Sequence, residues 1–285
     1  MNQLGITKCG NTEFQWGKRT YVMGIINMSP DSFSGDGIAN IDAALEQARR
    51  FASEGADILD VGGESTRPGF SSLSSQEEMQ RVVPVIERLS REVTVPISVD
   101  TSKLEVAKEA LAAGAAILND QWGLKKEPGL ADLAAEKGVP IILMSNQRDK
   151  GGYDAGAGRD TAYYRDVMSE VITSLRKSLA VALAAGVPSE NIIVDPGIGF
   201  GKTWQQDIEI IRRLSELKTL GRPILIGTSR KSLIKMVLNL PAGERMEGTA
   251  ATVAIGIAHG ADIVRVHDVK QMARVCRMAD AIIRT

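Results

Sequence analysis

One repeated alternation constrains the fold more than any other feature of this sequence: a short β-branched or apolar run, a loop, and then a stretch with helical periodicity. Such alternation is typical of parallel sheets covered by helices. Eight repeats within 285 residues predict an α/β fold, a single (β/α)₈ TIM barrel spanning residues 1–285, with an open doubly wound sheet as the alternative. Strands are expected at residues 21–27, 57–61, 96–100, 116–119, 139–144, 191–195, 223–227 and 262–266.

The segments between the strands support this prediction. In residues 41–56 the apolar residues recur at three- and four-residue steps, as on one face of a helix. Residues 1–20 resemble a hairpin with a turn near Gly10-Asn11, which could cap the bottom of the barrel, and residues 238–247 look like a loop between two helices after the seventh strand. Five helices are expected to end in a glycine that leads into the next strand: Gly55, Gly114, Gly138, Gly186 and Gly260.

Charge and cysteine content narrow the possible partners. Lys and Arg number 34 against 35 Asp and Glu, so no overall field favours nucleic acid or an anionic membrane, although a small anionic substrate is compatible. Cys9 and Cys276 lack metal-type spacing and are expected to be free thiols in the cytoplasm. The sequence shows no signal peptide and no apolar run that could span a membrane.

Polar residues follow seven of the eight expected strands. In a (β/α)₈ barrel, catalytic residues lie where the strands end and the next loops begin. Each residue alone could simply cap the following helix, but capping does not require polar groups at so many strand ends. We therefore predict a functional site at this rim. The polar strand ends include Asn27, Asp60, Asp100, Asn119, Asp120, Asp195, Arg265 and His267.

The residue types indicate an anion site beside a heterocycle site. Arginine and lysine suit phosphate oxygens, which points to Arg67, Lys231 and Arg265, with His267 as a further donor. Asn27 offers an oxygen ligand for Mg²⁺. The segment GIGFGK does not match a nucleotide-binding loop, and its glycines are expected to place Phe200 and Lys202 at the rim. The carboxylates and amide suited to a flat ring rich in N–H groups are Asp100, Asn119 and Asp195.

Several segments together resemble the dihydropteroate synthase family of pterin-binding barrels. The resemblance runs from about residue 22 to 268, in order and spacing, and it is most specific in its two opening loops and in DPGIGFGK. The matching segments are GIINMSPDSFSGDG, DVGGESTRPG, SVDTSK, LND, VDPGIGFGKT, IGTSRKS and Arg265-x-His267.

This resemblance implies that 6-hydroxymethyl-7,8-dihydropterin pyrophosphate condenses with p-aminobenzoate to give 7,8-dihydropteroate. It implies Mg²⁺ bound with help from Asn27, and catalytic roles for Asp100, Lys231, Arg265 and His267. The implied pyrophosphate ligands are Asn27, Arg67, Arg265 and His267; the pterin ligands are Asp100, Asn119, Met144, Asp195 and Lys231; Thr66, Phe200 and Ser229 are implied on the p-aminobenzoate side.

The implied reaction is dissociative: pyrophosphate leaves, and the aniline nitrogen attacks the resulting cation. The resemblance also implies sulfonamide sensitivity and a homodimer formed through the last helices, where residues 269–283 would suit an interface. The chain departs from the family at Ser145, where a histidine is usual, and at Trp122, where a small residue is usual. Two alternatives stay open: a pterin-binding methyltetrahydrofolate–corrinoid methyltransferase, and a non-catalytic pterin-binding barrel.

Overall fold

Eight parallel strands form the central sheet of the molecule. The computed structural model describes residues 4–28, 40–64, 73–148 and 166–284. The strand order is β8-β7-β6-β5-β4-β3-β10-β9, and a bridge between Val194 and Ile224 joins the two ends into a barrel. The expected closed barrel is confirmed. The strands are β3 Tyr21–Asn27, β4 Ile58–Gly62, β5 Ile97–Asp100, β6 Ile117–Asp120, β7 Ile141–Met144, β8 Ile192–Asp195, β9 Leu225–Ile226 and β10 Ile263–Val266.

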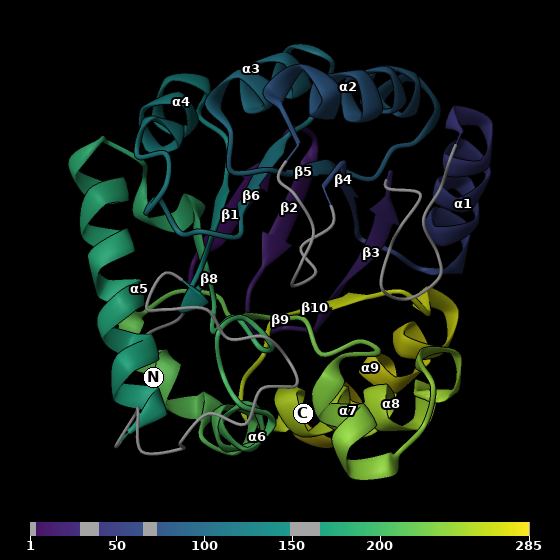
Figure 1. Cartoon of the computed structure of the whole chain (residues 1–285), viewed down its shortest axis with the longest axis vertical. Coiled ribbons are helices and arrows are strands. Elements are labelled where there is room, and N and C mark those ends of the chain that lie inside the picture. The colour runs from purple at the N-terminus through teal and green to yellow at the C-terminus, as the bar shows by residue number, and fades with distance from the viewer. Residues whose placement is uncertain (1–3, 29–39, 65–72, 149–165, 285) are drawn as a thin grey trace.

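The helices lie around the outside of the barrel (Figure 1). In the first of these helices, the four apolar residues predicted to share one face are buried: Ala44, Leu45, Ala48 and Phe51. The predicted loop after the seventh strand is confirmed, with a short 3₁₀ turn at Ala242–Glu244 between two helices. The helices are α1 Ile41–Glu54, α2 Ser75–Glu92, α3 Leu104–Ala112, α4 Gly129–Lys137, α5 Val167–Ala184, α6 Trp204–Arg212, α7 Ser232–Leu238, α8 Met246–Ala258 and α9 Val269–Ile283.

All five glycines expected at helix ends have left-handed backbone conformations. Their φ angles lie between 65° and 115°, a region in which other residues are strained. Each left-handed residue turns the chain out of a helix and toward the next strand. The sequence expectation for these helix ends is therefore confirmed.

The N-terminal hairpin consists of β1 (Ile6–Cys9) and β2 (Thr12–Gln15), joined by a turn at residues 10–11. Phe14, Trp16 and Tyr21 pack together, with ring centroids 5.0–5.5 Å apart. These rings belong to one buried cluster with residues near the amino ends of the barrel strands. The hairpin therefore closes the bottom of the barrel, as predicted.

Inside the barrel, the side chains change from apolar to polar along most strands. Alternate residues of a strand face the same side of the sheet, so the residue two positions after an inward-facing one also faces inward. Ile58, Ile117, Ile142, Ile193 and Ile263 belong to the lower cluster, near the hairpin. This arrangement gives an apolar lower half and a polar upper mouth. The inward positions two residues further on are Asp60, Asn119, Met144, Asp195 and Arg265, joined from β5 by Asp100.

Within the described ranges, no helix is both long and apolar enough to cross a membrane.

Candidate active site

Arg265 lies between two carboxylates at the mouth of the barrel. Its Nε donates to Asp60 Oδ2 at 2.5 Å, and its Nη2 donates to Asp100 Oδ2 at 2.9 Å. Asn119 Nδ2 donates to both oxygens of Asp60, at 3.1 and 3.3 Å. The side chain of Asp60 is fully buried, so this carboxylate requires the partners that it has. One hydrogen-bonded network thus joins β4, β5, β6 and β10.

Burial and the neighbouring charges act in opposite directions on the pKa of Asp100. Burial raises the pKa of Asp100 to about 8, the positive charge of Arg265 opposes the rise, and the negative charge of Asp60 adds to it. The amide nitrogen of Gln121 also donates to Asp100 Oδ2. Asp100 therefore titrates as part of a group in which two carboxylates share one guanidinium.

A second group contains Asp195, Lys231 and Phe200. Asp195 Oδ1 accepts a hydrogen bond from the Gly197 N–H at 2.7 Å. Burial raises the pKa of Asp195, and Lys231 opposes that rise. Burial lowers the pKa of Lys231 to about 8, and the attraction of Asp195 partly restores it. Lys231 Nζ donates to Ile198 O at 2.6 Å and lies 4.7 Å from the centre of the Phe200 ring.

Met144 forms the wall beside this second group. It is buried at the end of β7 and pairs in register with Asp195. The position of Met144 agrees with the apolar wall expected from the sequence.

His267 and Ser229 contact each other at the ends of the last two strands. Ser229 Oγ lies 2.8 Å from His267 Nδ1 and accepts the His267 backbone N–H at 3.2 Å. Because Oγ already accepts that N–H, its own proton can point to Nδ1, which leaves Nε2 as the N–H donor. The next residues also pair: Arg230 donates to both oxygens of Asp268, at 2.6 and 3.1 Å. These two pairs hold the loop after β9 against the loop after β10.

Asn27 lies at the end of β3, partly exposed and in register with Gly62. Among the described residues, no cluster of three or more His, Cys, Asp or Glu residues could hold a metal by itself. A site with a single amide oxygen fits Mg²⁺ only if phosphate oxygens and water complete the shell, which is how Mg²⁺ commonly binds.

The structure brings together most of the residues predicted for the site. Five of them lie at one mouth of the barrel: Asp100, Asn119, Asp195, Lys231 and Arg265. Asp195 is close enough to Arg265 for the charge of each to shift the pKa of the other. Four further predicted residues also lie at the carboxyl ends of strands or in the loops that follow them: Asn27, Phe200, Ser229 and His267. Thr66 and Arg67 lie outside the described residues.

One expectation was wrong, and the roles of two contributors were missed. Lys202 does not project at the rim, because its ammonium group is buried among backbone carbonyls. Asp60 was predicted only as one of the polar strand ends, with no role assigned to it, and Gln121 was not predicted. For Asp60 the signal was available: it is a carboxylate two residues after Ile58 in a buried strand. Gln121 follows β6 in a loop, where no periodicity indicates the direction of a side chain.

The two departures from the family pattern have defined contacts. Ser145 is buried, its N–H donates to Asp195 O at 2.9 Å, and its Oγ accepts from Gln147 Nε2 at 3.0 Å. Trp122 packs against Lys126, whose Nζ lies 3.7 Å from the ring centre. Ser145 therefore connects the loop after β7 to the strand that carries Asp195.

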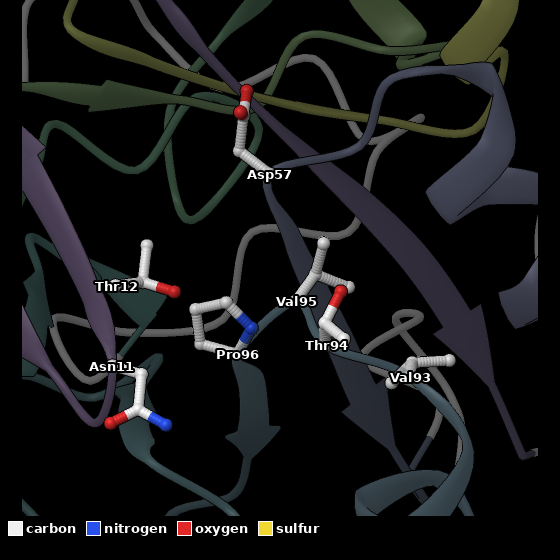
Figure 2. A pocket seen from close by; sticks show the side chains of 7 residues that line it. All are labelled: Asn11, Thr12, Asp57, Val93, Thr94, Val95 and Pro96. Carbon is white, nitrogen blue, oxygen red and sulfur yellow. The ribbon is translucent and has the colours of Figure 1, made fainter.

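A cavity of about 660 Å³ lies at the opposite end of the barrel (Figure 2). The hairpin residues Asn11 and Thr12 line it together with Asp57 and residues 93–96. The single charged group there, Asp57, already accepts hydrogen bonds from Arg19 and from the Val22 N–H. The charged groups that could perform chemistry gather at the polar mouth instead.

Comparison with known proteins agrees with this geometry. The model of the family described as "Pterin binding enzyme" matches residues 23–267. The closed barrel, its polar mouth and this match together define a pterin-binding enzyme.

A dihydropteroate synthase from Clostridium beijerinckii is 48% identical over 97% of this chain and 99% of its own length. A solved Clostridium difficile dihydropteroate synthase, in the presence of pteroic acid, is 47% identical with a TM-score of 0.86, covering 95% of this chain and 100% of the other. A Yersinia pestis dihydropteroate synthase, in complex with a sulfonamide drug, is 39% identical with a TM-score of 0.90, covering 98% and 99%. The chain belongs to the dihydropteroate synthase family, which makes it a transferase of folate biosynthesis.

Proposed function

We propose that the chain joins 6-hydroxymethyl-7,8-dihydropterin pyrophosphate to p-aminobenzoate at the mouth formed by the polar strand ends. The observation that carries this proposal is the pairing of two groups at one mouth: the Arg265 network, and the Asp195–Lys231 pair beside Phe200. A reaction that separates an anion from a ring cation needs both positive and negative groups close together.

The pterin ring lies between Asp100, Asn119 and Asp195 in this proposal, with Met144 against its face and Lys231 nearby. Asp60 binds the amide nitrogen of Asn119, so the Asn119 Oδ1 is directed elsewhere and can accept an N–H of the ring. A ring that lacked these N–H groups would leave buried acceptors unpaired, which is costly.

The pyrophosphate binds where Arg265 and His267 lie, with Asn27 as a further ligand. Arg67, also expected as a ligand, lies outside the described residues. With Ser229 at Nδ1, the Nε2–H of His267 is the group that would donate to a phosphate oxygen. Asn27 would hold Mg²⁺ together with pyrophosphate oxygens, and Mg²⁺ would supply charge neutralisation for the leaving group.

The reaction follows the dissociative route. Arg265 and His267 stabilise the departing pyrophosphate, while Asp100 and Asp195 stabilise positive charge that spreads into the pterin ring. The aniline nitrogen of p-aminobenzoate then attacks from the side where Phe200 and Ser229 lie. Thr66, expected on the same side from the sequence, is outside the described residues. No strong base is needed because the aniline nitrogen is already a nucleophile.

We further propose that residues 1–285 form one domain and that two copies associate through α7, α8 and α9. Apolar side chains on α7 and α9 are more than half exposed in one copy: Met236, Val237, Met278 and Ile282. On α8, Ile255 is 48% exposed. A patch of this kind on a helical face is typical of a subunit interface. The two buried free thiols, Cys9 and Cys276, suit a reducing compartment, so we place the reaction in the cytoplasm.

The test is a direct assay. Purified protein with Mg²⁺, the pterin pyrophosphate and p-aminobenzoate should release pyrophosphate and form dihydropteroate, and a sulfonamide should compete with p-aminobenzoate. A folded protein that binds the pterin without making product would instead be a binding module. Methyl transfer from methyltetrahydrofolate to a corrinoid protein would identify a methyltransferase. Either result would defeat the proposal.

A further inference from the structure

Lys202 makes an unusual set of contacts beneath the site. Its side chain is only 2% exposed, and its Nζ donates to Ser145 O at 2.8 Å, Gly197 O at 2.9 Å and Phe200 O at 3.3 Å. An ammonium group has three N–H donors, and these three carbonyls can accept all of them. Burial lowers the pKa of Lys202 to about 7, while the nearby Asp207 and Asp195 oppose that change. The three acceptors match the ammonium form.

The same turn, residues 197–200, is also held from two other directions. The Gly199 N–H donates at 2.9 Å to Asp207 Oδ1, a buried carboxylate on α6. Lys231 Nζ, from the loop after β9, donates to Ile198 O. Four consecutive residues of the turn are therefore each bound by a charged side chain.

The loops after β7 and β8 approach closely at this point. Gln147 N donates to Phe200 O at 3.2 Å. Gly197 and Gly201 both have left-handed φ angles, and a Cβ on either would collide with the backbone of Ser145 or Gln147. Lys202 joins the same two backbones, so it bridges the loop after β7 and the turn that ends at Phe200.

We propose that Lys202 and Asp207 are positioning residues for the p-aminobenzoate side: they hold the turn at residues 197–200 and thereby place the ring of Phe200 and the ammonium of Lys231. Lys202 and Asp207 do not contact substrate themselves. The inference rests on the proposed function, because that function assigns Phe200 to the p-aminobenzoate side.

The main variant is Lys202→Met, which keeps the length of the side chain and removes its three donors. It should raise the KM for p-aminobenzoate by about tenfold or more, since small displacements of positioning groups are costly. Binding of the pterin pyrophosphate, measured by calorimetry without p-aminobenzoate, should change less than about threefold. Lys137→Met is the control: Lys137 is half-exposed at the end of α4, where it pairs with Glu136. It should leave both values within about twofold.

A double-mutant cycle separates positioning from general destabilisation. If Lys202 acts through Phe200, the Lys202→Met/Phe200→Ala protein should have a KM for p-aminobenzoate close to that of Phe200→Ala alone. Independent effects would multiply instead, and that result would overturn the inference. So would equal losses in the affinity for both substrates.

Asp207 provides a test that does not depend on the folding of Lys202→Met. Asp207→Asn keeps an oxygen acceptor for the Gly199 N–H and should retain most of the p-aminobenzoate affinity. Asp207→Ala removes the acceptor and should raise the KM selectively. Equal behaviour of the two variants would contradict the inference. An inactive wild-type protein would instead contradict the proposed function, so the two failures can be told apart.

Discussion

At the scale of single residues, the distinguishing feature of the site is that its charged groups are buried and satisfied by one another. Asp60 binds both Arg265 and Asn119, and Arg265 also binds Asp100. In such a network a removed member leaves its partners buried without compensation, so a substitution affects both stability and catalysis.

Arg265→Ala tests this network. We expect a loss of about 2–4 kcal/mol in transition-state stabilisation, because a charged donor at the leaving group is removed. Two buried carboxylates also lose their cation, so the free energy of unfolding should fall by about 3–5 kcal/mol. Steady-state kinetics and urea denaturation measure the two effects.

Arg213→Ala is the control for Arg265→Ala. Arg213 contacts the carboxylates of Asp166, Glu209 and Glu216, but near the surface. Its removal should cost no more than about 1 kcal/mol and should not affect kcat/KM. Unchanged kinetics in Arg265→Ala would show that the assignment of Arg265 is wrong.

Lys231 should set the alkaline limit of activity. Because burial lowers its pKa to about 8, its ammonium loses a proton as the pH rises through 8, and kcat/KM should fall above that pH. Lys231→Arg stays charged at every accessible pH, so its profile should lack this fall even if its maximum is lower. A fall at the same pH in Lys231→Arg would assign the titration to a group other than Lys231. It could not be assigned to Asp100, whose pKa is also about 8, because loss of that proton creates the carboxylate that the reaction uses.

At the scale of elements, the helix ends and the strands together determine where the site residues lie. Five left-handed glycines each end a helix shortly before a strand, and most strands then carry an inward polar residue to the mouth. The helix ends at the bottom of the barrel therefore determine where each strand begins. They thereby determine the position of the site residue at the end of that strand, although they contact no substrate.

Gly138→Ala tests how much a left-handed glycine at a helix end contributes to stability. Gly138 has φ 65°, and a Cβ there would meet no atom within 4 Å, so the cost should come from the backbone alone, about 1–2 kcal/mol by urea denaturation. Gly243→Ala also adds a methyl group in open space, without a left-handed φ, and should be close to neutral. Equal stability of the two variants would contradict the backbone explanation.

At the scale of the whole molecule, the polar mouth and the hairpin lie at opposite ends of the barrel. The helices α7, α8 and α9, which carry the exposed apolar side chains, lie on the outside of the barrel (Figure 1). This separation allows association and chemistry to be altered independently. Substitutions on the patch should change the oligomeric state with little effect on the pKa values or contacts of the site.

The paired change Val237→Glu with Ile282→Glu should convert a dimer to a monomer in sedimentation equilibrium, since it places charges in an apolar interface. Val181→Glu on α5, also an exposed apolar position, is the control and should leave the association unchanged. A wild-type protein that is monomeric at micromolar concentrations would refute the proposed dimer.

The sequence by itself determined the order of elements, the helix-ending glycines, the hairpin and most of the polar strand ends. These are local properties: periodicity, turn chemistry and the parallel arrangement place carboxyl ends together without any knowledge of contacts. Only the tertiary structure decided that Arg265 is bound by Asp60 and Asp100, and that Lys202 is buried beneath the mouth rather than displayed on it. Those facts depend on the barrel closing, because contacts between β4 and β10, or between the loops after β7 and β8, join residues far apart in the chain.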